Sequence, residues 1–223
     1  MVEHVFRRTA MCEGINAGVY VATPDDEIAR AVEAFGGQAI MTSPAHQRAS
    51  DRVAEAAEGL DTDIVVMIQG DEPLITPEMV GSSYQPLLSD STLFCTNLVK
   101  RIETEAEFRD PNTIKVTMDH QGYALYFSRE PIPTTHSRSF SEIRAYKQVC
   151  IIPFPKRFLL EFARMTPTHL EEVESIDMLR ILEHGQRVMT VECNQQTHAV
   201  DVPADVTLVE SMMQGDLILS RYS

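Results

Sequence analysis

The stretch that decides the fold is "DIVVMIQGDEPLITPE", residues 63–78, in which an apolar run leads into a glycine, two carboxylates and a helix start. The run from Ile64 to Ile68 is apolar at every position, which is typical of a parallel strand covered on both faces. Thr76 and Pro77 match the residues preferred at the N-cap and first position of a helix. We therefore predict a strand, an acidic turn and a helix, in that order.

The same order of strand and helix repeats before this stretch. "AGVYVAT" (17–23) and "QAIMTS" (38–43) read as short strands, each followed by a helical pattern, and residues 2–9 show the spacing of an amphipathic helix. After residue 91 the apolar runs lengthen into "TLFCTNLVKRI", "NTIKVTMD", "YALYFSR" and "KQVCIIPF", which favour a mixed, β-rich part. We predict a single α/β domain over residues 1–223, with a doubly wound, mostly parallel half at 1–90 and a β-rich half at 91–223.

Composition limits the classes of partner. The chain has 33 acidic and 19 basic residues and a net charge of −14, which opposes binding to nucleic acid and to anionic membrane surfaces. It has no apolar run long enough to span a bilayer and no secretory signal pattern. The four cysteines form no CxxC pair, which favours free thiols in a reducing compartment. We expect a cytoplasmic protein that binds neither nucleic acid nor membrane.

Two acidic residues occupy the ends of predicted strands. Asp71 follows the strand at 64–68, and ligands of open α/β sheets bind beyond the carboxyl ends of strands. Its oxygens suit Mg²⁺, although Asp71 or Glu72 serving only as a cap is an equally open interpretation. In "HAVDVPADV" (198–206), Asp201 ends a second apolar run just before a helix, whereas Asp205 fits the first helical turn. One metal ion held between Asp71 and Asp201 is the hypothesis that this pattern favours.

Two further segments carry candidate binding groups. In "HQRASDR" (46–52), Ser50 and the following backbone N–H groups could receive an anion or a base edge, with Arg52 supplying charge. The alternative makes Ser50 an N-cap and the next residues a solvated first turn. Arg129, at the end of an apolar run, could clamp a carboxylate or simply pair with Glu130 or another surface acid. The GxGxxG, GxxxxGK[ST] and GxSxG motifs are absent, which excludes the chemistries that depend on them.

Taken together, "TSPAHQRASDRVAEA", "IVVMIQGDEPLI", "PNTIKVTMDHQGYALYFSREPIP" and "AVDVPADV" resemble the 3-deoxy-manno-octulosonate cytidylyltransferases, the CMP-Kdo synthetase family of lipopolysaccharide biosynthesis. The resemblance covers nearly the whole chain. It implies a Rossmann-like, GT-A-like nucleotidyltransferase fold that forms a homodimer through its β-rich half. It also implies a transferase that uses CTP and Mg²⁺ to attach CMP to an acidic sugar and releases pyrophosphate.

The resemblance assigns roles residue by residue. Asp71 and Asp201 match the motifs QGDEP and VDxPxD, which implies that they are the catalytic metal ligands. The implied nucleotide-binding residues are His46, Gln47, Ser50, Asp51, Arg52 and Gln69. The implied acceptor-binding residues are Arg129, Gln148 and Asp177, although the family has histidine in place of Gln148 and glutamate in place of Asp177. These two replacements leave open a different acidic acceptor, such as another ulosonic acid or a phosphonate.

The start of the chain departs from the family pattern. Members of the family open with a strand and a phosphate-binding loop that resemble IPARxxSxRLPGKPL. This sequence begins about where the following helix should start. We therefore expect the first strand to be missing, neighbouring strand edges to lack partners, and the chain to be a truncated form or one with a misassigned start. A catalytically silent, nucleotide-binding relative is the alternative that this departure leaves open.

Overall fold

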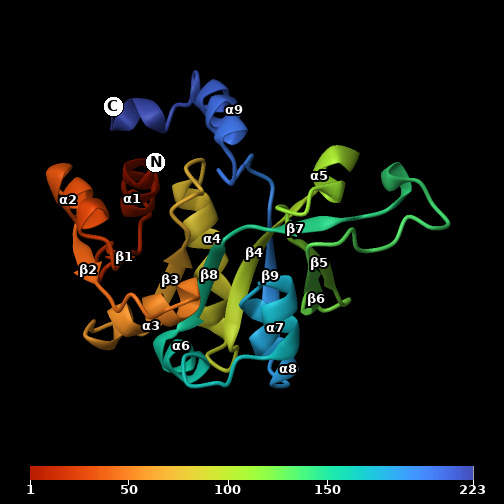
Figure 1. Cartoon of the computed structure of the whole chain (residues 1–223), viewed down its shortest axis with the longest axis horizontal. Coiled ribbons are helices and arrows are strands. Elements are labelled where there is room, and N and C mark those ends of the chain that lie inside the picture. The colour runs from red at the N-terminus through yellow and green to blue at the C-terminus, as the bar shows by residue number, and fades with distance from the viewer. Residues whose placement is uncertain (223) are drawn as a thin grey trace.

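The computed structural model describes residues 1–222 and shows an α/β arrangement (Figure 1). The helices are α1 (Val2–Ala10), α2 (Asp26–Ala34), α3 (Ala49–Glu58), α4 (Pro77–Ser89), α5 (Glu105–Arg109), α6 (Lys156–Phe162), α7 (His169–Glu174), α8 (Met178–Glu183) and α9 (Pro203–Met213), with 3-10 turns η1 (Phe140–Glu142) and η2 (Leu219–Arg221). The strands are β1 (Val21–Thr23), β2 (Ala39–Met41), β3 (Ile64–Ile68), β4 (Cys95–Arg101), β5 (Lys115–Met118), β6 (Ala124–Ser128), β7 (Tyr146–Gln148), β8 (Ile151–Pro155) and β9 (Val188–Cys193).

The strands form one five-stranded sheet in the order β6-β5-β7-β4-β9 and two pairs, β3-β8 and β1-β2. β4 runs parallel to β9 and β1 parallel to β2, whereas β3-β8, β4-β7, β5-β6 and β5-β7 are antiparallel. The predicted α/β class is confirmed, but the sheet is more mixed than the mostly parallel one expected. The reason is that the chain through β7 and β8 runs against both β4 and β3.

One long segment joins the five-stranded sheet to β3. After β7, the Val149 N–H donates to the Leu98 carbonyl at 2.8 Å, and the Cys150 carbonyl accepts from the Gln69 N–H at 3.1 Å. β8 then pairs with β3 along its length. Within residues 1–222, β1 pairs with β2 alone and β3 with β8 alone, so one edge of each lacks a strand partner, as the sequence predicted.

Helices cover both faces of the central strands because neighbouring side chains alternate between faces. On one face, Leu98 and Ile151 pack with α1 and α4; on the other, Val99 and Ile152 pack with α3, α6 and α8. All of these side chains are at most 3% exposed, which explains the continuous apolar runs in the sequence. The carboxyl end of β3 therefore emerges from a core that is closed on both sides.

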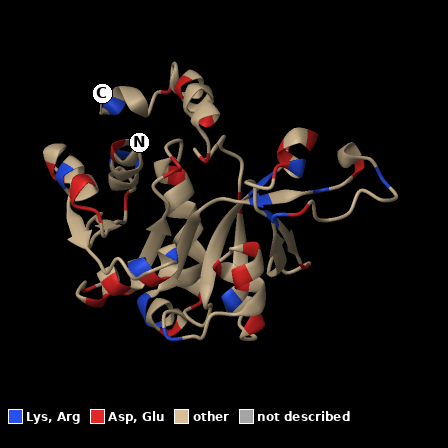
Figure 2. Cartoon of the chain, viewed as in Figure 1, with Lys and Arg blue, Asp and Glu red and all other residues tan. Residues whose placement is uncertain are grey.

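Charged residues lie mostly on helices and loops, and acidic residues outnumber basic ones (Figure 2). An exception is the buried row Lys100, Lys147 and Lys115, which lie opposite one another on β4, β7 and β5. Lys100 forms an ion pair with Glu103 and Lys147 with Glu107, and the Lys115 ammonium donates to backbone carbonyls.

None of the helices among residues 1–222 is both long and apolar enough to traverse a bilayer.

Candidate active site

The turn after β3 presents Asp71 without using it as a cap. Thr76, not Asp71 or Glu72, caps α4, because its hydroxyl oxygen accepts the Met79 N–H at 3.2 Å. The Oδ1 atom of Asp71 is buried and has no hydrogen-bond partner. An orphaned carboxylate oxygen is costly unless a ligand satisfies it, so the capping interpretation loses its support.

The structure brings the segment of Asp201 to the turn of Asp71. The Val200 N–H donates to the Asp71 carbonyl at 2.9 Å, although the two residues are far apart in the sequence. Asp205, in the first turn of α9, accepts from the N–H groups of Asp201 at 2.9 Å and Val202 at 2.8 Å. The carboxylate of Asp205 thereby satisfies the start of α9, where Val202 offers no polar side chain.

Electrostatics at this point of the fold favour a cation. Burial raises the pKa of Asp71 to about 6, and the negative charges of Glu72 and Asp201 add to the effect. The pKa of Asp201 is also raised, by partial burial and by Asp205 and Asp110, with the guanidinium of Arg129 opposing. Mutually repelling carboxylates, with Asp71 half-buried and Asp201 exposed, create a site that a bound cation would stabilise.

Glu72 supports the site from beneath. It is 4% exposed, and its carboxylate accepts from the Cys150 N–H at 3.2 Å and from the Thr197 hydroxyl at 2.6 Å. Burial raises the pKa of the Cys150 thiol, and Glu72 and Asp71 raise it further. Cys150 and Thr197 thus lie against the acidic turn, and no motif in the sequence had pointed to either.

The predicted acceptor residues Arg129 and Gln148 lie on the β-rich side. Arg129 donates to the carbonyls of Glu174 at 2.7 Å, Pro111 at 3.0 Å and Ser175 at 3.4 Å, so its guanidinium is held by backbone rather than by Glu130. Gln148 donates from Nε2 to the Asn97 Oδ1 at 2.5 Å. The positive charge of Arg129 lowers the pKa of Asp201, so this guanidinium acts electrostatically on one of the two metal candidates.

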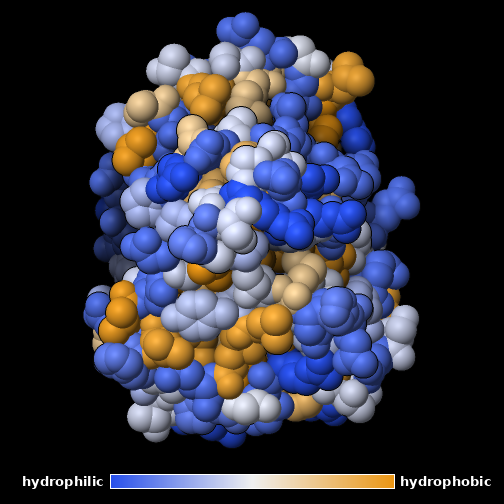
Figure 3. Space-filling view, turned by 90° about the vertical axis from the view of Figure 1, so that its right-hand side faces the viewer, coloured by the Kyte–Doolittle hydropathy of each residue, from blue (hydrophilic) through white to orange (hydrophobic). Residues whose placement is uncertain are grey.

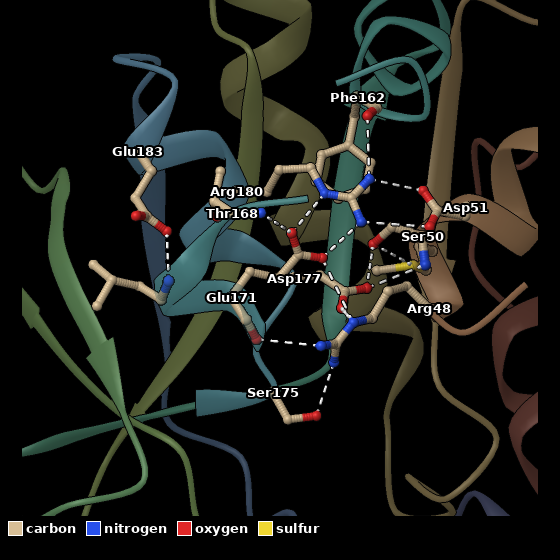
Figure 4. Close-up of polar contacts among 12 residues, drawn as sticks. Arg48, Ser50, Asp51, Phe162, Thr168, Glu171, Ser175, Asp177, Arg180 and Glu183 are labelled. Carbon is tan, nitrogen blue, oxygen red and sulfur yellow. Dashed lines mark hydrogen bonds and ion pairs between the residues drawn. The ribbon is translucent and has the colours of Figure 1, made fainter. Parts of the chain in front are cut away.

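Asp177 and Ser50, predicted for the acceptor and the nucleotide respectively, contact each other (Figure 4). The buried Ser50 donates to the Asp177 carboxylate from its hydroxyl at 2.8 Å and from its backbone N–H at 3.2 Å. Ser50 is not the N-cap of α3, a position taken by Arg48. Burial raises the pKa of Asp177, and the bonds from Ser50 and the charge of Arg48 oppose that rise. The two predicted halves therefore meet here through a buried polar contact.

Asp51 takes part in a charge cluster that the sequence did not reveal (Figure 4). Arg180, on α8 and 2% exposed, forms a two-pronged contact with the fully buried Glu171, at 2.7 and 2.6 Å. It also donates to Asp51 at 2.9 Å, and its guanidinium lies 4.2 Å from the centroid of the Phe162 ring. The cluster joins α3 to α7 and α8, which fixes the helix that carries Ser50, Asp51 and Arg52.

The remaining nucleotide candidates shape the loop before α3 or follow β3. Arg52 donates to the Thr42 hydroxyl at 2.9 Å and to the carbonyls of Ser43 and His46. His46 contacts the Glu55 carboxylate at 2.5 Å, and the exposed Gln47 bonds only to a carbonyl of its own loop. Gln69 is half-buried directly before the acidic turn. The predicted nucleotide set is thus divided between this loop, the Arg180 cluster and the end of β3.

The donor set at Asp71 and Asp201 fits a hydrated, hard cation. No cluster of three or more His, Cys, Asp or Glu side chains suited to a metal exists among residues 1–222, which argues against a closed zinc-type site. Mg²⁺ differs from zinc because it keeps several waters and takes one or two protein carboxylates together with substrate phosphates. The orphaned oxygen of Asp71 supplies the unsatisfied acceptor that such an ion needs.

Comparisons with known proteins all indicate the same family, the cytidylyltransferases. Residues 1–190 match the family model described as cytidylyltransferase. A 3-deoxy-manno-octulosonate cytidylyltransferase from Geotalea uraniireducens is 44% identical over 218 residues, which covers 94% of this chain and 86% of the relative. The enzyme of the same name from Geobacter sulfurreducens is 42% identical, with 94% of this chain and 87% of the relative covered.

Solved structures agree with the predicted fold. A CMP:2-keto-3-deoxy-manno-octonic acid synthetase complexed with CTP matches with a TM-score of 0.87 and 34% identity, over 97% of this chain and 88% of that one. A glucose-1-phosphate thymidylyltransferase from Bacillus anthracis matches with a TM-score of 0.63 at 13% identity, which is a likeness of fold alone. The nucleotidyltransferase-type α/β fold expected from the sequence is confirmed.

Proposed function

The chain belongs to the cytidylyltransferase family, and we propose that it transfers CMP from CTP to the acidic sugar 3-deoxy-manno-octulosonate, releasing pyrophosphate. It is a nucleotidyltransferase, as the sequence predicted. Relatives and a solved neighbour named for this reaction align along almost the whole chain, and the neighbour was solved with CTP. Within the protein itself, the observation that carries the proposal is the bond from the Val200 N–H to the Asp71 carbonyl, which brings the segment of Asp201 to the turn after β3.

We propose that Asp71 and Asp201 bind Mg²⁺ together with the phosphates of CTP. When bound, this ion supplies Lewis-acid polarisation of the phosphate oxygens. The orphaned Oδ1 of Asp71 and the raised pKa values of both carboxylates support the assignment. Glu72 accepts the Thr197 hydroxyl, and this bond holds the segment before Asp201 against the turn of Asp71.

In this reaction the anomeric hydroxyl of the sugar attacks the α-phosphorus and releases its proton to solvent, the new P–O bond forms, and the bond to pyrophosphate breaks. The main task of the protein is to hold both substrates in line and to compensate charge. We propose that Arg129, with its guanidinium fixed by three carbonyls, faces the sugar carboxylate, and that Gln148 and Asp177 contact its hydroxyls. His46, Gln47, Ser50, Asp51, Arg52 and Gln69 are proposed to form the cytidine side.

Pyrophosphate release tests the function and the acceptor. The purified chain is incubated with CTP and Mg²⁺ and with 3-deoxy-manno-octulosonate, another ulosonic acid or a phosphonate, and a no-acceptor reaction is the control. We expect release that depends on the first acid. Release only with another acid would support the altered-acceptor alternative that Gln148 and Asp177 left open. A folded chain that releases nothing with any acceptor would contradict the enzymatic proposal and support the silent nucleotide-binding alternative.

We also propose that the chain is one domain, with residues 1–90 as the nucleotide half and 91–223 as the acceptor and dimerisation half. The larger core cluster supports this arrangement because it packs Ala54 and Met67 of the first half with Phe154 and Leu179 of the second. A cytoplasmic location is part of the proposal. The four cysteines, all free thiols, fit a reducing compartment.

A homodimer through the β-rich half is a further proposal. Figure 3 shows apolar side chains gathered over the part of the molecule that carries β5, β6 and α7. Leu125 on β6 and Val173 on α7 are 62% and 68% exposed. Light scattering after size exclusion should give a dimer, and Leu125→Asp with Val173→Asp should give a monomer. Leu88→Asp is the matched control, since Leu88 on α4 is also 62% exposed. This variant should keep the molar mass of the dimer. A monomeric wild type would contradict the proposal.

A further inference from the structure

Arg8 is a buried cation of α1 that lies outside the predicted substrate residues. Its side chain is 1% exposed. It donates to the Ile75 carbonyl at 3.2 Å and to the Tyr222 hydroxyl at 2.9 Å, and it forms an ion pair with Asp216. A buried charge requires such partners, and here they come from two separate segments. Arg8 thus joins the turn that follows Asp71 to the chain that follows α9.

The helix α9 has few other contacts to hold it. Val209 and Met213 pack with Leu74, whereas Val206 and Leu208 on the same helix are 44% and 46% exposed. Figure 1 shows α9 at the top of the molecule, away from the sheet, with the chain after it returning beside α1. The position of α9 therefore depends strongly on how its two ends are attached.

Hydrogen bonds attach the backbone of Asp201 to the start of α9. The Asp205 carboxylate accepts the N–H groups of Asp201 and Val202, which couples the backbone of Asp201 to the first helical turn. The Val200 N–H attaches the same segment to the Asp71 carbonyl. Because a short helix moves as a rigid element, a tilt of α9 about this attachment displaces the Asp201 carboxylate relative to Asp71.

We propose that Arg8 is a positioning residue for the metal-binding pair: by holding Asp216 and Tyr222 at the far end of α9, it fixes Asp201 opposite Asp71. The inference rests on the proposed function, since it takes the two aspartates as the metal ligands. Arg8 touches neither of them and acts only through α9. Burial of Asp216 opposes ionisation, but the bond from Arg8 keeps the pKa of Asp216 below its usual value, so the ion pair persists at neutral pH.

Hydrogen–deuterium exchange of the metal-free protein tests the hold on α9 without any need for turnover. In Arg8→Gln, the backbone amides of α9 after Pro203 should exchange about tenfold faster, because the end of the helix loses a charge-assisted contact, while those of β4 keep their wild-type rates. Arg7→Gln is the matched control. Arg7 lies on the same helix, pairs with the half-exposed Glu3 at 2.7 Å, and should leave α9 unchanged.

Metal affinity tests the consequence for Asp201. Mn²⁺, which takes the same oxygen ligands as Mg²⁺, is titrated in the presence of CTP, and free Mn²⁺ is followed by its EPR signal. The Mn²⁺ dissociation constant should rise about tenfold in Arg8→Gln, because small displacements of a ligand are costly. Arg8→Lys, which keeps a cation for Asp216, should recover part of the affinity. Tyr222→Phe, which removes one of three partners, should give an intermediate value if Arg8→Gln does not fold.

Two results would overturn the role of Arg8. One is exchange of α9 that is the same in Arg8→Gln and the wild type. The other is faster exchange of α9 with an unchanged Mn²⁺ dissociation constant, which would make the contact purely structural. Failure of the proposed function has a different signature, since a folded wild type would then release no pyrophosphate, whereas exchange and Mn²⁺ binding would still decide the role of Arg8.

Discussion

The Asp71→Asn variant is expected to lose roughly 10³-fold in the rate of pyrophosphate release while keeping its fold. An amide has nearly the shape of the carboxylate but no charge, so it is a poor ligand for Mg²⁺. The loss should persist at high Mg²⁺ concentration, because the metal would lie between phosphate and one carboxylate only. The measurement is the rate of release from CTP with saturating acceptor, with Glu33→Gln, the corresponding change on an exposed carboxylate of α2, as the control.

The same variant should be more stable than the wild type in the absence of metal. The pKa of Asp71 is raised to about 6 in the folded protein, from 3.8, so unfolding releases a proton between these pH values. The contribution of Asp71 to the free energy of unfolding is thus fully present below pH 3.8 and is lost as the pH rises through about 6. Partial exposure reduces the effect to about 1–2 kcal/mol.

Asn does not titrate, so Asp71→Asn should gain that stability above pH 6 and little of it near pH 4. Thermal unfolding in a chelating buffer at both pH values measures the difference. Wild-type turnover in Asp71→Asn would refute the ligand role, and a pH-independent difference in stability would refute the raised pKa.

The acidic turn could be predicted because its signal is local. A fully apolar strand, a glycine and an aspartate follow one another in residues 64–71, and the carboxyl ends of strands are where open α/β sheets bind ligands. Asp201 carries a weaker signal, a short apolar run before a helix start, and the expected strand there is wrong, because β9 ends at Cys193 and the chain from there to α9 forms no strand. The sequence pattern did not reveal what joins them, since the contacts of Val200 with Asp71 and of Thr197 with Glu72 depend on how distant segments fold together.

The direction of the strands and the buried ion pairs could not be predicted from neighbouring residues in the sequence, for two physical reasons. "KQVCIIPF" is apolar because both faces of β8 are covered, and such a run looks the same in a parallel and an antiparallel strand. Arg180 stands in an otherwise apolar helix turn, and its partner Asp51 is 129 positions away, so nothing near Arg180 indicates its contact. Ser50 could be read as a helix cap for the same reason, because its partner Asp177 comes from another helix.

The Arg180→Met variant is expected to lose about 3–5 kcal/mol of unfolding free energy, a large share of the stability of a typical domain. Methionine fills much of the space but removes the two-pronged partner of Glu171, which is 0% exposed and is left with the longer contact to the Arg48 guanidinium at 3.5 Å. Asp51 loses the same cation. The expected cost comes chiefly from the stranded charge of Glu171 and not from lost packing. Urea unfolding at neutral pH measures it.

A second arginine separates this effect from the loss of any ion pair. Arg187 pairs with Asp119 at 3.0 Å, but its side chain is 53% exposed, so Arg187→Met should cost no more than about 1 kcal/mol. If stranding of Glu171 is the cause, Glu171→Met added to Arg180→Met should recover most of the loss, because an apolar pair replaces a buried ionic one at little cost. Strictly additive losses in the double variant would instead mean that packing around α7 and α8, and not charge, accounts for the role of Arg180.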